Sequence, residues 1–538
     1  MKAVARGAAL LTCVLIVAAC LRAAPSGTRH AWTRAGELSW TEGEDIDNLN
    51  PLLTTEILVT DLSALTQGYL VLPNAAGTLV PSLAVAVPTQ ANHLISADGK
   101  TIVYTLRHGV VWHDGAPFTS ADVAFSVATI LDPRFNVANR LGFDDITSVG
   151  TPDPYTVVVH LREPYAPFVS LFLTPHVGSG IVPAHVLRGQ DLNHAAYNGL
   201  PVGLGPFRYV RWSRGNDVEL AAFDRWWGGR PQLRRITYRI IPDATAAINQ
   251  LRTHELDGFA RIPNEEYPSA KAVAGTRTLD FPTTSFDHID FNLQRPILGD
   301  RRVREALAHA IDRQTILQKI DRGSGALSCS PVPPGSWAYD ARTPCVPFDL
   351  AAANRLLDAS GWKMGRSGIR EKNGHALRLT LVSTVGNLTR LEAAVLMQSS
   401  FAKIGVELAY RRYPANELFA HPDGILASGK FDLALYQWYW GVDPDLSDLY
   451  SCAAVSPRGQ NESRYCNPEV ERLLHDALVH YDRARRRADY VRIQEVLAHD
   501  LPSITLSAVT GHFTINSDFH NVNPGPTLIL TTPARISN

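Results

Sequence analysis

A short run of aromatic and acidic residues is the part of the sequence best suited to binding a ligand. The stretch Tyr436–Asp445 reads YQWYWGVDPD and holds four aromatic side chains and two carboxylates. Aromatic faces offer a large, rigid contact area, and a carboxylate can bind a cationic group of a ligand. We therefore predict ligand contacts for five of these residues: Trp438, Tyr439, Trp440, Asp443 and Asp445. The alternative is that alternate aromatics pack in the core and the Asp-Pro pair only forms a turn.

Motifs of the common enzyme classes are missing from the sequence. It contains no HExxH, no GxSxG elbow and no CxxC metal spacing. The segment Gly424–Lys430 has the spacing of a phosphate-binding loop, but Phe431 follows where such a loop carries Ser or Thr. His108 and His113 flank a glycine and favour hydrogen bonds in a turn over metal ligation. We predict no catalytic residue, no metal site and no cofactor, so the protein is not an enzyme.

The N-terminus has the features of an export signal. Basic residues precede an apolar run over residues 8–19 that is too short to span a membrane as a mature helix. The run ends in VAAC at residues 17–20, which resembles a bacterial lipobox, whose cysteine carries lipid. We predict a signal peptide over residues 1–20 with lipid on Cys20. The alternative is an ordinary signal peptide cleaved near residues 23–24.

The cysteines beyond this segment form two sequence-local pairs: Cys329 with Cys345, and Cys452 with Cys466. In an exported protein, such pairs are candidates for disulfide bonds. We predict one bond within each pair, although four cysteines allow three connectivities. Metal binding by the four is the alternative, and their spacing does not support it.

Length and charge limit the class of protein. A chain of 538 residues is longer than one hydrophobic core supports, so two or more domains are expected. Its 45% hydrophobic and 19% charged content is that of a globular protein. A net charge of −1 gives no broad basic field to attract nucleic acid. The partner is therefore a small molecule or another protein.

Hydrophobic periodicity supplies the framework that must position the binding stretch. Residues 101–107 alternate as a strand, and a capped helix is predicted to begin at Thr119. A second α/β unit has strands at 377–383 and 406–410 around a helix at 390–404. These segments predict a mixed α/β protein.

Three further segments are predicted to connect the units or flank them. Residues 285–293 form a crossing strand, and strands at 504–506 and 512–515 return toward the first unit. Residues 469–501 read as helical, with Arg485–Arg487 on a solvated face.

One long motif resembles a known family. Residues 98–125, DGKTIVYTLRHGVVWHDGAPFTSADVAF, are similar to the signature of solute-binding protein family 5. Further resemblance lies in GLGPF at 203–207, RWWGGRP at 225–231 and AIDR at 310–313. The family comprises dipeptide-, oligopeptide- and nickel-binding lipoproteins or periplasmic proteins of ABC importers.

The resemblance implies an α/β fold of the type II periplasmic-binding-protein kind, with two lobes, an extra subdomain and a ligand cleft between the lobes. We expect lobe I at residues 30–280, including an inserted subdomain at about 60–200. Lobe II is expected at 285–505, with residues 506–538 returning to lobe I.

The resemblance also implies a function. We expect an exported periplasmic or cell-surface lipoprotein, monomeric and anchored through lipid, that captures short peptides and delivers them to ABC permease subunits. Alternatives are the same fold with an oligosaccharide, an opine-like compound or a metal chelate, a sensor lipoprotein without a permease, or an enzyme such as a peptidase. No nucleic-acid partner is expected.

The binding stretch departs from the family pattern at one position. The stretch is similar to the family's G-W-x-A-D-Y-x-DP segment, in which an aspartate receives the α-amino group of a peptide. Matching Asp443 and Pro444 to the family's DP places that aspartate at Trp440. Either Asp443 or Asp445 takes over the role, or the ligand lacks a free amine.

Overall fold

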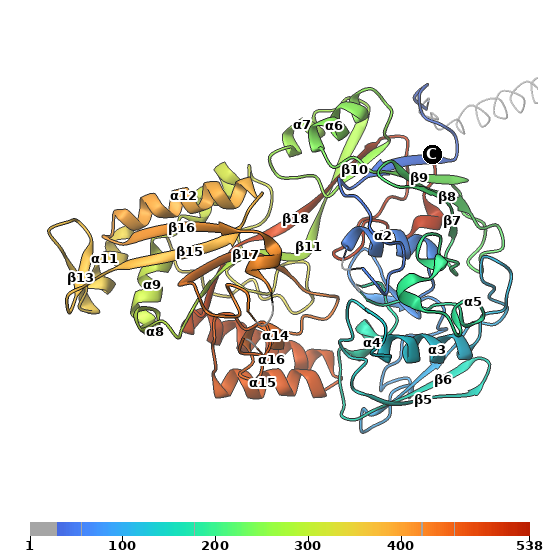
Figure 1. The fold of residues 1–538 in the computed structure, drawn as a ribbon, viewed down its shortest axis with the longest axis horizontal. Coiled ribbons are helices and arrows are strands. Elements are labelled where there is room, and N and C mark those ends of the chain that lie inside the picture. The colour runs from blue at the N-terminus through green and yellow to red at the C-terminus, as the bar shows by residue number, and fades with distance from the viewer. Residues whose placement is uncertain (1–28, 55, 177, 421–422, 457) are drawn as a thin grey trace, which may run out of the picture.

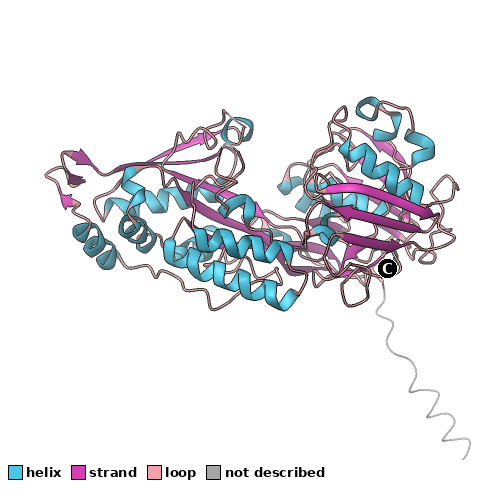
Figure 2. Ribbon diagram, turned by 90° about the horizontal axis from the view of Figure 1, so that it is seen from below, coloured by secondary structure: helices cyan, strands magenta, loops and turns pink. Residues whose placement is uncertain are grey.

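A ten-stranded sheet runs through the molecule and joins two lobes (Figure 1). Its strand order is β16-β15-β17-β11-β18-β10-β1-β9-β8-β7. The structure, a computed structural model, describes residues 29–538 apart from 55, 177, 421–422 and 457. The predicted signal peptide at residues 1–20, with Cys20, lies outside the described residues. Lobe I here means the part with β1 and β7–β10, and lobe II the part with β15–β17; Figure 2 shows the two bodies from a second direction.

The two crossing strands are β11 (Thr276–Phe291) and β18 (Ser503–Asn516). They pair antiparallel from Thr276 opposite Asn516 to Asp290 opposite Ser503, so each contributes to both lobes. The crossing prediction at 285–293 is confirmed in position, but the strand begins earlier. The two short strands predicted at 504–506 and 512–515 are wrong in extent, because both are parts of the single strand β18, which pairs with β11 on both sides of a register shift.

The hydrophobic core of lobe I is built from residues near both ends of the chain. Trp40, Phe207, Tyr238 and Phe513 are fully buried in it. Beyond β18, Ile529 N donates to Asp61 Oδ1 at 2.9 Å, which fastens the C-terminal segment to this lobe. The elements of lobe I are β1 (Glu37–Thr41), α2 (Ile57–Thr66), β7 (Phe207–Ser213), β8 (Asp217–Ala222), β9 (Arg235–Arg239), α6 (Ala244–Arg252), β10 (Gly258–Ala260), α7 (Tyr267–Lys271) and η4 (Pro533–Arg535).

A smaller unit with its own core is inserted in lobe I. Its elements are β2 (Val71–Pro73), β3 (Leu79–Pro81), β4 (Thr101–Thr105), α3 (Ser120–Leu131), β5 (Ile146–Asp153), β6 (Thr156–Leu161), α4 (Phe168–Leu171), α5 (Ala184–Leu187), η1 (Leu192–His194) and η2 (Ala196–Asn198). The predicted strand and capped helix of the signature motif are confirmed as β4 and α3. Thr119 N donates to Asp122 Oδ2 at 3.0 Å, which closes a capping box.

His113 connects the signature motif at 98–125 to the GLGPF segment at 203–207. His113 lies 3.0 Å by Nε2 from the carbonyl of Gly205, and Gly203 N donates to its Nδ1 at 3.2 Å. These contacts assign a neutral ring with the proton on Nε2. Burial lowers the pKa of His113 to about 4, which agrees with that assignment. The ring of His113 makes hydrogen bonds, but to a segment 90 and 92 residues away and not within its own turn as predicted.

The paired glycines allow a close backbone contact. A Cβ at Gly203 would lie 1.9 Å from the carbonyl oxygen of Thr66, and one at Gly205 would lie 2.5 Å from that of Leu65. The segment therefore packs against the end of α2, and glycine is needed for space.

Lobe II has parallel strands covered by helices. As predicted, β15 and β16 flank α12, and their buried core includes Leu381, Met397 and Phe401. The elements of lobe II are α8 (Pro296–Gly299), α9 (Arg301–His309), α10 (Arg313–Thr315), the π-helix η3 (Ile316–Ile320), α11 (Leu350–Ala359), β12 (Lys363–Met364), β13 (Arg370–Lys372), β14 (His375–Ala376), β15 (Arg378–Thr384), α12 (Leu388–Ala402), β16 (Glu407–Tyr413), α13 (Ala415–Leu418), β17 (Leu433–Tyr439), α14 (Ser447–Tyr450), α15 (Pro468–Val479) and α16 (Arg483–Asp500).

The segment predicted as one helix at 469–501 is two helices. The chain leaves helical geometry at His480, and the Asp482 side chain accepts from Arg485 N to begin α16. The predicted solvated face at Arg485–Arg487 is also wrong in part, because Arg486 is only 5% exposed.

The structure brings both predicted cysteine pairs to disulfide-bonding distance. The Cα atoms are 5.3 Å apart for Cys329 and Cys345, and 4.7 Å apart for Cys452 and Cys466. Both separations suit a disulfide.

We predict that Gly203→Ala destabilises the protein strongly, because the new methyl group would meet the backbone of α2. Thermal unfolding followed by circular dichroism should show a melting temperature several degrees below the parent. Gly199→Ala is the matched control, since a Cβ there meets nothing closer than 3.7 Å. Equal melting temperatures for both variants would contradict this packing.

Candidate functional site

The predicted binding stretch leaves the end of β17 and enters the space beside lobe I. β17 pairs antiparallel with β11, with Tyr439 opposite Ser285. Beyond the strand, Trp440 N donates to Thr284 O at 3.1 Å, and the Thr284 hydroxyl donates to Trp440 O at 2.5 Å. The loop that follows, residues 440–448, is therefore fixed to a crossing strand.

The three predicted aromatic contacts have different environments. Trp440 is 4% exposed and donates through Nε1 to Pro331 O at 2.7 Å, so it packs in the core as the alternative interpretation stated. Trp438 is half-buried and lies edge-on to Trp440, with ring centroids 5.8 Å apart. Tyr439 is 53% exposed. Tyr439 therefore faces solvent, whereas the half-buried Trp438 packs against the buried Trp440.

Asp443 is already paired within lobe II. Arg486 of α16 donates to its two carboxylate oxygens at 2.7 and 2.6 Å, and Arg486 Nε donates to Ala477 O. The guanidinium lies 5.2 Å from the ring of Trp337. Both charges are almost fully buried, so the pair holds the loop rigidly and leaves Asp443 little capacity for a ligand.

Asp445 and Asp448 are carboxylates with no salt-bridge partner among the residues that the structure describes. Asp445 accepts from Ser447 N at 2.9 Å and from the hydroxyl of Tyr165, in the inserted unit, at 3.3 Å. Burial raises the pKa of Asp445. Burial and the neighbouring Asp445 raise the pKa of Asp448 to about 6, although its side chain remains accessible. Asp448 lies near Tyr165 of the inserted unit, whose hydroxyl pKa is raised by burial and by the carboxylates of Asp445, Asp443 and Asp448.

Sequence reasoning missed Asp448 and a charged cluster on lobe I. Arg261 donates to Glu42 Oε2 at 2.8 Å and to Asp61 Oδ2 at 2.6 Å. Glu42 and Arg261 follow the parallel strands β1 and β10, at the carboxyl ends where open α/β sheets bind ligands. Burial raises the pKa of Glu42 and of Glu44. The Arg261 side chain is 29% exposed, and its Nη1 has no partner among the described residues.

Arg261 also has a strained backbone, with φ at +53°. A left-handed conformation at a residue other than glycine, asparagine or aspartate is unusual and is often found at functional sites. The sequence around Arg261 shows a short strand at Gly258 but no motif that would mark Arg261 as functional.

The lobes also touch away from the crossing strands. Tyr481, between α15 and α16, donates to Gly99 O at 3.0 Å and lies 3.2 Å from Tyr165 O. Ala166 N donates to Leu478 O at 2.6 Å. In Figure 1 this contact lies below, and β11 and β18 join the lobes above.

An interlobe cavity of about 150 Å³ lies between these two connections. Its lining residues come from lobe I, from lobe II and from β11: Ala76, Gly77, Pro526 and Thr527; Pro334, Gly335, Ser336, Trp337 and Val442; and Thr284. Val442 belongs to the 440–448 loop, so the cavity adjoins the predicted binding stretch.

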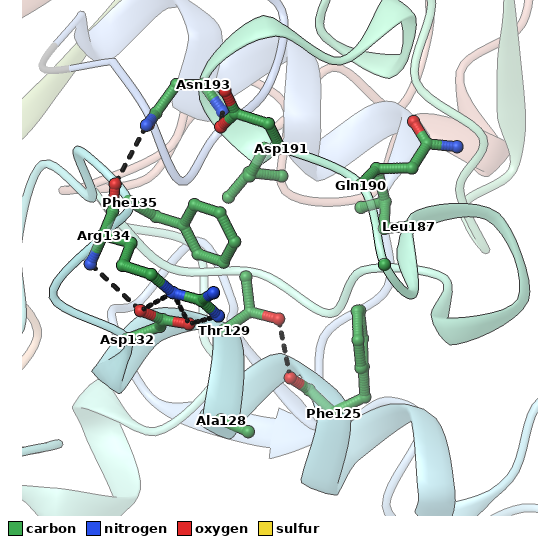
Figure 3. Close-up of a pocket in the computed structure, with 12 residues that line it drawn as sticks. Phe125, Ala128, Thr129, Asp132, Arg134, Phe135, Leu187, Gln190, Asp191 and Asn193 are labelled. Atoms are coloured by element: carbon green, nitrogen blue, oxygen red, sulfur yellow. Dashed lines mark hydrogen bonds and ion pairs between the residues drawn. The ribbon is translucent and has the colours of Figure 1, made fainter.

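A larger hollow of about 500 Å³ lies on the inserted unit, at Phe125, Leu187 and Asp191 (Figure 3). Its polar groups already bond to one another. Arg134 pairs with Asp132, and Asn193 donates to Arg134 O at 3.0 Å. It contains no residue of lobe II, so we do not assign the binding site to it.

A serine, a histidine and an aspartate line up at the crossing strands. Ser324 Oγ lies 2.5 Å from His512 Nε2, and His512 Nδ1 lies 2.8 Å from Asp280 Oδ1. The order is that of a hydrolase triad. Ser324 is 3% exposed, however, and its hydroxyl also lies 2.8 Å from Asn264 Oδ1. We interpret the group as a structural tie between the crossing strands and the loops on either side.

Within the described ranges, no three metal-ligating side chains gather. No helix in that part of the chain is long and apolar enough to cross a membrane.

Two lobes, a shared sheet and an interlobe cavity define a type II periplasmic binding protein. Residues 78–460 match the family described as "Bacterial extracellular solute-binding proteins, family 5 Middle". The match covers more than half of the chain, and the chain belongs to this family, as the signature motif indicated.

Individual relatives support the same assignment. Protein XP55 of Streptomyces lividans is 33% identical over 445 residues, covering 82% of this chain and 78% of that protein. The structure of the oligopeptide-binding protein AppA from Bacillus subtilis with a nonapeptide has a TM-score of 0.76 at 25% identity, covering 93% and 98% of the two chains. The structure of NikZ from Campylobacter jejuni with Ni(L-His) has a TM-score of 0.78 at 25% identity, covering 94% and 100%.

We predict that Trp440→Ala lowers the free energy of unfolding by about 3–5 kcal/mol, because it empties a buried site. Tyr439→Ala is the matched control on the same strand end and should change it by no more than about 0.5 kcal/mol. Denaturant unfolding of both variants measures the difference. A Trp440→Ala protein as stable as the parent would show that the residue does not support the core.

Proposed function

We propose that the protein is an exported solute-binding lipoprotein that captures short peptides and delivers them to the permease of an ABC importer. The observation that carries this proposal is the pair Asp445 and Asp448, two carboxylates beside Tyr165 of the inserted unit that have no cationic partner among the described residues. A peptide supplies the missing positive charge through its α-amino group. AppA, a relative over most of its length, binds a nonapeptide in its solved structure.

The two lobes carry complementary groups. Asp445 and Asp448 on lobe II suit the amino group. Arg261 on lobe I, whose Nη1 has no partner among the described residues, suits a peptide carbonyl or carboxylate. Tyr439 adds an exposed aromatic face. Backbone pairing would let the site accept many peptide sequences.

We propose that β11 and β18 act as the hinge for lobe closure. Lobe I would take residues 30–280 with the insert at about 60–200, lobe II residues 285–505, and residues 506–538 return to lobe I. The export signal, lipid on Cys20 and the two disulfides belong to the same proposal, which places a monomeric protein outside the cytoplasmic membrane. Capture and release need no bond chemistry, so no catalytic residue is proposed.

A metal chelate is the second candidate ligand. NikZ binds Ni(L-His), and a chelate of this kind brings its own metal ligands. This agrees with a site whose described residues gather no metal-ligating cluster.

We predict that Asp448→Asn weakens binding of a short peptide with a free N-terminus by about tenfold or more, because a buried charge pair is lost. Isothermal titration of a binder found by a thermal-shift screen measures the change. The N-acetylated peptide should bind weakly to the parent, and the exposed Asp224→Asn is the control variant.

The same carboxylate sets a pH dependence. A cationic ligand requires ionised Asp448, whose pKa is about 6 before binding, so affinity should fall as the pH drops through that value. Equal affinity for the free and acetylated peptides, or affinity independent of pH between 5 and 7.5, would contradict the assignment of the amine site.

A further inference from the structure

The interlobe cavity of about 150 Å³ has a lining without a charged residue. The ring of Trp337 and the side chains of Val442, Pro334 and Pro526 supply apolar surface. A cavity of roughly 150 Å³ is large enough to hold a group of benzene size, and hydroxyl and backbone groups share its lining with the apolar side chains. It is too small for more than one side chain. A charged group there would lose its hydration without gaining a partner.

The cavity lining contains a buried hydroxyl without a partner. The Oγ1 of Thr527 has no hydrogen-bond partner in the described part of the chain. Of the other two hydroxyls of the lining, Thr284 donates to Trp440 O, and Ser336 accepts from Ala338 N at 3.3 Å. A buried hydroxyl without a partner favours a ligand group that can form one hydrogen bond with it.

The walls are held in place by their surroundings. Trp337 lies under the guanidinium groups of Arg483 and Arg486, at 4.9 and 5.2 Å. Gly335 must be glycine, because a Cβ there would lie 2.2 Å from Thr283 O. These contacts fix the positions of Trp337 and Gly335 in the cavity wall.

The cavity lies within reach of the charge site. Val442 precedes Asp445 by three residues, which extended chain spans in at most ~11 Å. A ligand residue bound at Asp445 and Asp448 would bring its own side chain, or that of a near neighbour, to Val442. Because the walls come from both lobes, the cavity exists as a closed pocket only when the lobes are together.

We infer that this cavity is a specificity pocket that takes one compact, uncharged side chain of the bound ligand, of phenyl size or smaller. The inference rests on the proposed function and deepens it. The Thr527 hydroxyl lines one wall of the pocket. Filling the pocket bridges Val442 and Trp337 of lobe II to Pro526 and Thr527 of lobe I, so an apolar side chain favours the closed form.

The probe is a tripeptide series built on Ala-Ala-Ala, with Phe, Leu, Lys or Glu placed at each position in turn. Isothermal titration should find one position at which Phe or Leu binds about tenfold tighter than Ala, and Lys or Glu binds no tighter than Ala. Val442→Trp, which fills the pocket from lobe II, should abolish this gain, so that the Phe and Leu peptides bind no tighter than Ala-Ala-Ala.

Thr527→Leu fills the same pocket from lobe I and keeps the test valid if Val442→Trp does not fold. Val385→Trp is the matched control, because Val385 is 51% exposed and outside the pocket. A parent that binds the series without preferring an apolar side chain at any position overturns the pocket alone. So does a preference that both filling variants retain. A parent that binds no member of the series overturns the pocket together with the peptide function.

Discussion

The antiparallel pairing of β11 and β18 is the constraint on which the rest of the structure depends. It is the only described strand pairing that continues the sheet from one lobe into the other. The register shifts between Pro282 and Phe286, where regular pairing is interrupted. Thr284 lies within this interruption and fixes Trp440 through two hydrogen bonds. The irregular part of the crossing strands is therefore also the anchor of the binding loop.

This arrangement links ligand contact to lobe position. The 440–448 loop is attached to β11 at Thr284 and to α16 through Asp443 and Arg486. Breaking a buried charge pair of this kind commonly costs several kcal/mol, so the loop moves with lobe II as a unit. Tyr165 reaches the same loop from lobe I. A lobe I residue is therefore in contact with Asp445, one of the two carboxylates without a salt-bridge partner among the described residues.

Local patterns in the sequence were enough for much of the fold. Alternation predicted β4, the Thr119 cap predicted α3, and close spacing in the chain predicted the two cysteine pairs. Period-two alternation also put Trp438 and Trp440 on one side of the strand and Tyr439 on the other. It could not show that the side with Trp440 is buried, because that depends on Pro331 and Phe286, far away in the chain.

The charged groups of the site were beyond the reach of local patterns. Arg261 contacts Glu42 and Asp61, which lie 219 and 200 residues away. Arg486 stands in a run of three arginines, and only the fold shows that the middle one turns inward to Asp443. The long helix was wrong because His480 to Asp482 contain neither proline nor glycine, and the break follows from the Asp482 cap.

The most direct test of the account is mass spectrometry of the ligand released from protein purified without denaturant and beginning after Cys20. We expect a set of short peptides with free N-termini and at least one compact apolar side chain. A single sugar, a metal chelate or another non-peptide molecule would keep the family and contradict the peptide function.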